Sequence, residues 1–260
     1  MSGGYDPDFF ALLDAVEDRH FWFRARGRAV AALAEQVTAP LPPGHRVLEL
    51  GCGNGGMLKV LHRACPRGMV IGMDLFAEGL RHARRRTPCP LIQGDVHRPP
   101  FAARFELIGL FDVLEHIPDD RRTLDDIRAL LADGGALLMT VPAHPALWSY
   151  FDEASHHCRR YTAGDLREKL TRAGLVVEYL TPFMAPLYPL MWAARRLKTW
   201  RRGAGGEGAS AAQMSAAELR IVPGMNAVMD CLLAHETPLL VRRRQLAMGT
   251  SLLAIARRAR

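Results

Sequence analysis

The chain has 260 residues, is 49% hydrophobic and carries a formal charge of +7, which is ordinary for a protein that buries a core. Its five cysteines include no CxxC pair, so we expect neither a disulfide framework nor a zinc site, and a reducing compartment fits best. Residues 1–10 lack the basic and apolar regions of a signal peptide, which predicts a cytoplasmic protein.

The basic residues gather in the C-terminal third of the chain. Residues 181–260 carry a formal charge of +8, which leaves −1 for residues 1–180. A localised basic region favours an acidic substrate, a phosphate-bearing ligand or an anionic membrane surface. The alternative interpretation is a solvated arginine-rich face without a charged partner.

Two helices are predicted ahead of the first strand, within residues 6–37. Apolar residues recur there with helical spacing from Val30 to Val37. Three prolines and a glycine within residues 40–44 then break the pattern. We therefore expect residues 1–44 to form an N-terminal helical cap.

From residue 46 onward, short apolar runs alternate with helical stretches. Strand–helix–strand alternation at this spacing predicts a parallel sheet with helices on both faces, which is a doubly wound α/β fold. The predicted strands are residues 46–50, 69–73, 91–93, 107–111, 136–141, 175–181 and 251–255, and the predicted helices are residues 56–65, 76–86, 120–132 and 165–173.

Residues 184–245 interrupt the alternation before the last strand. An apolar piece ending near Trp192 is followed by a basic piece, Arg195 to Arg202, a small-residue loop and a helix from about Met225 to His235. We interpret this stretch as a helical lid inserted into one domain, whose core is residues 45–183 and 246–260. A peripheral membrane contact is the alternative, because an apolar piece beside a basic one is typical of interfacial helices.

The strongest functional signal is VLELGCGNGG, Val47 to Gly56, at the end of the first strand. Glycines after a strand let the backbone turn tightly and approach a ligand, and the following helix N-terminus presents free N–H groups. The glycines also fit the dinucleotide pattern GxGxxG, which is weak evidence alone. Asp74, which ends the second strand, can accept hydrogen bonds from the hydroxyls of any adenosyl ribose.

The later motifs distinguish a dinucleotide from other ligands that carry an adenosyl ribose. Gly94-Asp95-Val96 ends the third strand, and FDVLEHIPDD, Phe111 to Asp120, ends the fourth. With LELGCGNG, they resemble the class I S-adenosylmethionine-dependent methyltransferases, specifically the type 11/12-like small-molecule group with its Rossmann-like sheet. HFWFRARGR, from His20, and PAHPALWSYFDEASHHCRRYT, from Pro142, resemble a narrower bacterial set within that group.

The resemblance implies S-adenosyl-L-methionine as the cofactor and a set of residues that bind it. Glu49 supports the ammonium group, and Gly51 and Gly53 line the methionine part. Asp74, with the adjacent Leu75, lies at the ribose hydroxyls. The resemblance further places Asp95 at the adenine amino group, Val96 on the adenine ring, and Phe111 and Asp112 beside the sulfonium.

Catalytic candidates follow the fifth strand, because active sites in such sheets lie at the carboxyl ends of strands. They are His144, His157 and Tyr161, with His144 or His157 as the base. His116, in the LEHI turn, is interpreted as a structural residue.

Three further residues are predicted to contact the substrate. Arg159 and Arg160 form an adjacent pair that suits a carboxylate or phosphate, although both could instead pair with nearby acidic residues. Trp22, with the arginines around it, could close over the site or simply pack on the domain.

These observations predict a methyltransferase that acts on an O- or N-nucleophile of a small acidic or lipophilic metabolite, as a monomer or homodimer. An RNA methyltransferase using the basic C-terminal third is one alternative, although the sequence contains no recognised RNA-binding module. A non-catalytic cofactor-binding scaffold is another, and an NAD-dependent enzyme fits GxGxxG but not DVLEHIPD. No metal is predicted, because no tight His/Asp/Glu cluster has ligand spacing.

Overall fold

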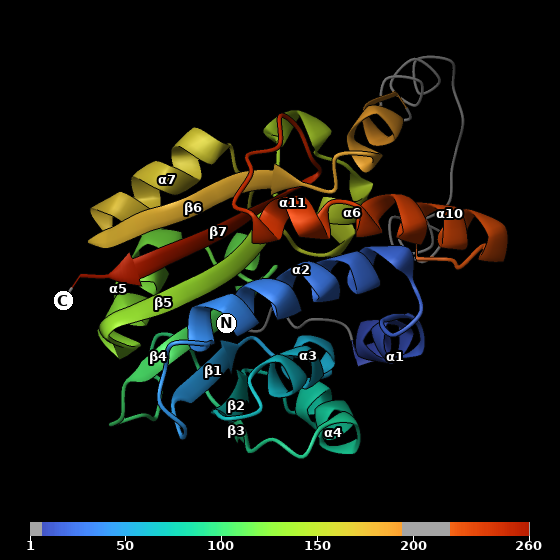
Figure 1. Cartoon of the computed structure of the whole chain (residues 1–260). Coiled ribbons are helices and arrows are strands. Elements are labelled where there is room, and N and C mark those ends of the chain that lie inside the picture. The colour runs from blue at the N-terminus through green and yellow to red at the C-terminus, as the bar shows by residue number, and fades with distance from the viewer. Residues whose placement is uncertain (1–6, 194–218, 260) are drawn as a thin grey trace.

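The computed structural model describes residues 7–193 and 219–259, and its centre is a seven-stranded sheet with the strand order β3-β2-β1-β4-β5-β7-β6 (Figure 1). Strands β1 to β5 pair in parallel, whereas β7 runs antiparallel to both of its neighbours, β5 and β6. The strands are β1 Arg46–Leu50, β2 Met69–Asp74, β3 Leu91–Gln93, β4 Phe105–Phe111, β5 Leu131–Pro142, β6 Leu175–Phe183 and β7 Ser251–Arg258.

Helices cover both faces of the sheet, so the predicted doubly wound α/β fold is confirmed (Figure 1). One apolar core joins the sheet to α2, α3, α4, α10 and α11, and a second core joins it to α5 and α7. The helices are α1 Pro7–Val16, α2 Phe21–Thr38, α3 Gly56–Ala64, α4 Ala77–Arg86, α5 Asp120–Leu130, α6 Tyr150–Ala154, α7 Ala163–Arg172, α10 Pro223–Ala234 and α11 Thr237–Val241.

The apolar patterns explain why these segments form these elements. The interior of β1 is almost wholly apolar, as expected for a parallel strand with helices on both faces. In α2 the buried residues Val30, Leu33, Ala34 and Val37 recur at three- and four-residue spacing and form one stripe against the sheet. Each Å2 of apolar surface that is buried in this way stabilises the fold by about 25 cal/mol, and this burial holds the layers together.

The predicted parallel sheet contains one antiparallel strand, β7. Ser251, the first residue of β7, pairs with Pro142, the last residue of β5. The chain therefore enters β7 at the carboxyl end of the sheet and must run back along β5. The long connection after β6 permits this reversal, because it returns to the sheet at the end where β6 finishes.

The described part of the predicted lid packs mainly beside α2. Asp230 of α10 accepts a hydrogen bond of 2.7 Å from Arg28, and the side chain of Asn226 accepts one of 2.9 Å from the backbone N–H of Phe21. Residues 187–193 are helical. The basic piece Arg195 to Arg202 and the small-residue loop lie outside the described residues. In the described ranges, no helix combines the length and apolar character needed to cross a membrane.

The sheet order fixes the place of a ligand site. The chain winds outward from β1 to β3 in one direction and from β4 to β5 in the other. In such sheets, ligands bind at the carboxyl ends of the strands where the winding direction changes. Here that point lies between β1 and β4.

Candidate active site

A cavity of about 1370 Å3 opens at the point between β1 and β4. The loops after β1, β2, β4 and β5 line it, together with α1 and the first turns of α2. Its volume is large enough for a nucleoside cofactor together with a small acceptor. All nine residues predicted to bind the cofactor line this cavity, and their individual roles remain predictions: Glu49, Gly51, Gly53, Asp74, Leu75, Asp95, Val96, Phe111 and Asp112.

The glycine loop after β1 has a backbone that side chains rarely permit. Gly51 adopts a φ of 70°, and a Cβ at this position would lie 2.5 Å from the Val113 side chain. Gly53 has a φ of 47°, and a Cβ there would meet nothing within 4 Å. Because Gly53 has no side chain, it leaves open space at the cavity wall that a ligand can occupy.

Asp74 is fixed by two backbone donors at the end of β2. One carboxylate oxygen accepts a hydrogen bond of 2.7 Å from Gly53 N–H, and the other accepts one of 2.8 Å from Phe76 N–H. Burial raises the pKa of Asp74, although these hydrogen bonds oppose the shift. Each oxygen retains acceptor capacity, so the carboxylate can also receive hydroxyl donors from a ligand.

Glu49 is a buried acceptor with unused capacity. The residue is 2% exposed, and its Oε2 atom has no hydrogen-bond partner among the described residues. Burial raises the pKa of Glu49 well above its usual value, although the Arg26 guanidinium opposes this shift. A ligand ammonium group at this position would satisfy the orphaned oxygen and favour the carboxylate form.

The remaining predicted cofactor residues differ in how they are held. Asp95 is exposed, and its side chain accepts a hydrogen bond of 2.9 Å from His97 N–H. Asp112 has a φ of 53°, accepts a hydrogen bond of 3.0 Å from Thr140 and forms an ion pair with Arg26. The guanidinium of Arg26 also lies 4.6 Å from the ring centre of Trp22. Trp22 thus lines the cavity and stacks on Arg26, which is paired with Asp112.

The other end of the cavity is built from the segment after β5. His157 Nδ1 lies 2.9 Å from an oxygen of Asp152, and the same carboxylate receives two hydrogen bonds, of 2.7 and 3.0 Å, from Arg160. Asp152 is fully buried, and its bonds to His157 and Arg160 lower its pKa to about 2 despite the opposing effect of burial. The carboxylate therefore stays charged and holds the His157 ring in one orientation.

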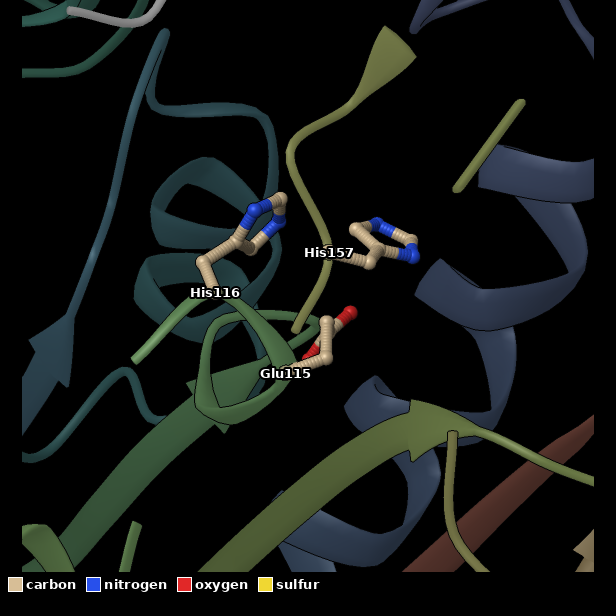
Figure 2. A group of neighbouring side chains, drawn as sticks. All are labelled: Glu115, His116 and His157. Carbon is tan, nitrogen blue, oxygen red and sulfur yellow. The ribbon is translucent and has the colours of Figure 1, made fainter. Parts of the chain in front are cut away.

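Glu115 and His116, in the turn after β4, lie beside His157 (Figure 2). The ring centres of His116 and His157 are 4.7 Å apart and the rings are nearly perpendicular. Burial lowers the pKa of His116 to about 3, with a further contribution from His157. Burial also raises the pKa of Glu115 well above its usual value, and Asp112 adds to the shift.

Three predicted catalytic or substrate residues lie away from the cavity. The hydroxyl of Tyr161, which is fully buried, donates a hydrogen bond of 3.0 Å to Asp120. Arg159 pairs with the same carboxylate at 2.7 Å. His144 packs on Tyr188, with ring centres 4.9 Å apart. None of the three is among the described residues that line the cavity, and direct roles for Tyr161, Arg159 and His144 remain predictions.

Three residues that build the site are not predicted from the sequence. Arg26 and Glu115 line the cavity, and Asp152 lies buried behind His157. The sequence signal for Asp152 was Ser149 three residues before it, because the two side chains form a capping box at the start of α6. The signal for Arg26 was its place in HFWFRARGR.

The arrangement fits a class of protein: doubly wound α/β enzymes whose cavity can take an adenosyl cofactor beside an acceptor. A family model described as a methyltransferase domain matches residues 19–180. A trans-aconitate 2-methyltransferase of Azoarcus sp. (strain BH72) is 30% identical over 187 residues, which cover 71% of either chain. The chain therefore belongs to the methyltransferase domain family.

Two solved structures share the fold at low sequence identity. An S-adenosylmethionine-dependent methyltransferase from Clostridium acetobutylicum has a TM-score of 0.56 and 11% identity, over 90% of this chain and 92% of that one. The N-methyltransferase NodS from Bradyrhizobium japonicum, solved with S-adenosyl-L-homocysteine, has a TM-score of 0.51 and 17% identity, over 90% and 86%. The prediction of a class I S-adenosylmethionine-dependent methyltransferase is confirmed.

The residues of the cavity fit this cofactor. Its ammonium group matches the orphaned oxygen of Glu49, and its ribose hydroxyls match the acceptor capacity of Asp74. The open space at Gly53 admits a ligand beside the glycine loop. The scaffold alternative loses its support, because the chain belongs to an enzyme family and its cofactor end is intact.

Proposed function

We propose that this methyltransferase acts on a hydroxyl or amine of a small lipophilic acceptor, with His157 as the base. The observation that carries the proposal is the buried Asp152–His157 pair at the wall of an aromatic cavity that also contains the cofactor residues. When bound, S-adenosylmethionine supplies a methyl group that is already activated by its sulfonium. The protein has then to align the acceptor and take up its proton.

His157 is suited to proton uptake because its ring is oriented by Asp152. With Nδ1 donating to the Asp152 carboxylate at 2.9 Å, Nε2 carries the lone pair that can accept the acceptor's proton. Asp152 also stabilises the imidazolium that forms, as a carboxylate partner does in other histidine bases. Arg160 keeps that carboxylate charged and in place.

The charges of the cavity favour a lipophilic acceptor over an acidic one. Among the described lining residues there is no lysine, and each of the two arginines is already paired, Arg26 with Asp112 and Arg160 with Asp152. A carboxylate substrate would have to compete with these acidic partners. Aromatic and apolar side chains dominate the rest of the wall, including Trp22, Phe151 and Leu187.

An acidic acceptor is the competing candidate, because the Azoarcus relative is named for trans-aconitate. Incubation of the purified protein with S-adenosylmethionine and matched sets of phenols, aliphatic amines and polycarboxylic acids, trans-aconitate included, separates the two. We expect S-adenosylhomocysteine to form with phenols or amines. Turnover confined to the acids would overturn the lipophilic assignment.

The role of His157 is tested on the acceptor that the screen identifies. We expect His157→Ala to lower kcat by about 100-fold or more, since general bases contribute roughly 10²–10⁴-fold. The affinity for S-adenosylhomocysteine should stay within about twofold. His144→Ala is the matched control, because His144 lies outside the cavity lining. Unchanged kcat in His157→Ala removes the residue from the mechanism.

A further inference from the structure

Three metal-ligating side chains converge at the acceptor end of the cavity. One ligand atom from each of Glu115, His116 and His157 lies within 4.8 Å of the other two. Figure 2 shows the Glu115 carboxylate and the two rings around a common space, with Glu115 and His116 coming from one turn and His157 from a separate segment. The methyl-transfer scheme above uses only His157 of the three.

Glu115 is the member of the cluster that is buried with an unsatisfied carboxyl oxygen. The residue is 1% exposed, and its Oε2 atom has no hydrogen-bond partner among the described residues. A buried carboxyl oxygen without a hydrogen-bond partner destabilises the folded protein. Glu115 is one of the residues that line the cavity. An ion in the space shared with the two imidazoles would satisfy its Oε2 atom.

The histidines carry the support that ligating imidazoles usually have. His157 is bonded through Nδ1 to Asp152 at 2.9 Å, which directs Nε2 away from that carboxylate. Carboxylate–histidine–metal triads of this kind fix the orientation of the ring. The backbone of Ser155 and His156 hydrogen-bonds to His116 and fixes the second ring.

We propose that Glu115, His116 and His157 form a binding site for one divalent transition-metal ion, such as Zn2+. Two imidazoles and one carboxylate suit ions of this class better than Mg2+ or Ca2+, which prefer oxygen ligands. Ligand atoms about 2.0–2.2 Å from Zn2+ lie about 3–4 Å apart, so small side-chain rotations close the site.

The site goes beyond the proposed methyl transfer and excludes one step of it. The Nε2 lone pair of His157 cannot bind an ion and accept a proton at the same time. An ion held here therefore removes the base, and the metal-loaded protein is inhibited toward acceptors that need it. Metal binding itself requires neither cofactor nor acceptor.

The site is tested by calorimetric titration of the metal-free protein with Zn2+, without cofactor or acceptor. We expect one Zn2+ per chain, with an affinity that falls by about tenfold or more in Glu115→Gln and in His157→Ala. His156→Asn is the matched control: His156 is the neighbouring histidine outside the cluster, and asparagine tolerates its φ of 56°. This variant should bind Zn2+ like the wild type.

Three results would overturn the site: no saturable binding to the wild type, wild-type affinity in folded Glu115→Gln and His157→Ala, or an equal loss in His156→Asn. Circular dichroism checks the fold of each variant. X-ray absorption of the zinc-loaded wild type needs no variant, and it must show two imidazoles in the first shell. Because catalysis is not measured, failure here leaves the proposed methyl transfer standing, and failure of the acceptor screen leaves the site standing.

Discussion

Asp152 at the acceptor end of the cavity has a different environment from Glu49 and Asp74 at the cofactor end. At the cofactor end, burial raises the pKa values of Glu49 and Asp74, and backbone N–H groups hold Asp74 in place. At the acceptor end, burial also acts on Asp152, but its bonds to His157 and Arg160 prevail and lower its pKa to about 2. Glu49 has spare acceptor capacity, whereas the charge of Asp152 is already neutralised.

The two environments indicate which of these carboxyl groups a ligand can stabilise. Glu49 is a buried carboxyl group with an orphaned oxygen, so a cation from outside improves its environment. The carboxylate of Asp152 is already paired with Arg160 inside the protein. A cationic ligand therefore cannot stabilise Asp152 as it can stabilise Glu49. Substitutions of Glu49 and Asp74 should therefore alter the affinity for the cofactor, whereas substitution of Asp152 should alter stability.

The largest effect is expected from Asp152→Asn. Removal of this charge leaves Arg160 buried without a counterion, which costs about 3–5 kcal/mol of the free energy of unfolding. Urea denaturation measures the loss. The control is Asp165→Asn, which removes only a 3.8 Å pair between half-exposed Asp165 and Lys169 and should cost less than about 1 kcal/mol. Equal losses in the two variants would contradict the ion-pair account of this end.

The next effect is a loss of cofactor affinity in Asp74→Asn. The amide keeps the size of the side chain but weakens its hydrogen bonds to the ligand hydroxyls, and we expect about 100-fold weaker binding of S-adenosylhomocysteine. Calorimetry measures it. Asp95→Asn is the comparison, with a loss of about tenfold or less, because Asp95 is exposed to water. A folded Asp74→Asn protein with wild-type affinity would show that the ribose does not bind there.

A smaller effect is expected from pH at the cofactor end. Because the pKa of Glu49 is raised in the free protein, an ammonium ligand that favours the carboxylate must displace a proton. The affinity for S-adenosylhomocysteine should therefore increase with pH, by up to about tenfold per pH unit. The increase begins above the pKa of Glu49 in the complex and ends at its raised value in the free protein.

Calorimetry in two buffers of different ionisation enthalpy measures the displaced protons directly. Glu49→Gln should bind the ligand more weakly and release fewer protons, because glutamine has no proton to lose. If the variant and the wild type release the same number of protons, Glu49 is not the group that titrates.

The sequence predicted the cofactor end well because its contacts are local to strand ends. VLELGCGNGG places Glu49, Gly51 and Gly53 within one strand and loop, and Asp74 ends the adjacent parallel strand. Parallel pairing brings such ends together without further information. The seven strands followed from apolar runs in the same way, and only the direction of β7 required knowledge of where the chain returns.

The acceptor end was less predictable because its contacts join separate segments. Glu115 and His157 follow different strands, and no spacing in the sequence predicts that their side chains lie close together. Arg159 and Arg160 are adjacent in sequence, yet they pair with Asp120 and Asp152 and face different surroundings. Tyr161 was expected at the site and lies in the core beside Asp120 instead. Side-chain direction after a strand depends on tertiary packing, which a single sequence does not reveal.

Alanine substitutions at two glycines distinguish backbone strain from ligand contact at the glycine loop. Gly53 and Gly44 both have positive φ values, 47° and 83°, and a Cβ at either position would meet nothing within 4 Å. Gly53→Ala and Gly44→Ala should therefore each lower the free energy of unfolding by a similar amount, about 1–2 kcal/mol, for the left-handed backbone alone. Only Gly53 lines the cavity, so only Gly53→Ala should also weaken S-adenosylhomocysteine binding. If both variants bind the ligand like the wild type, the open space at Gly53 does not receive the cofactor, and the resemblance of the glycine loop would not extend to this contact.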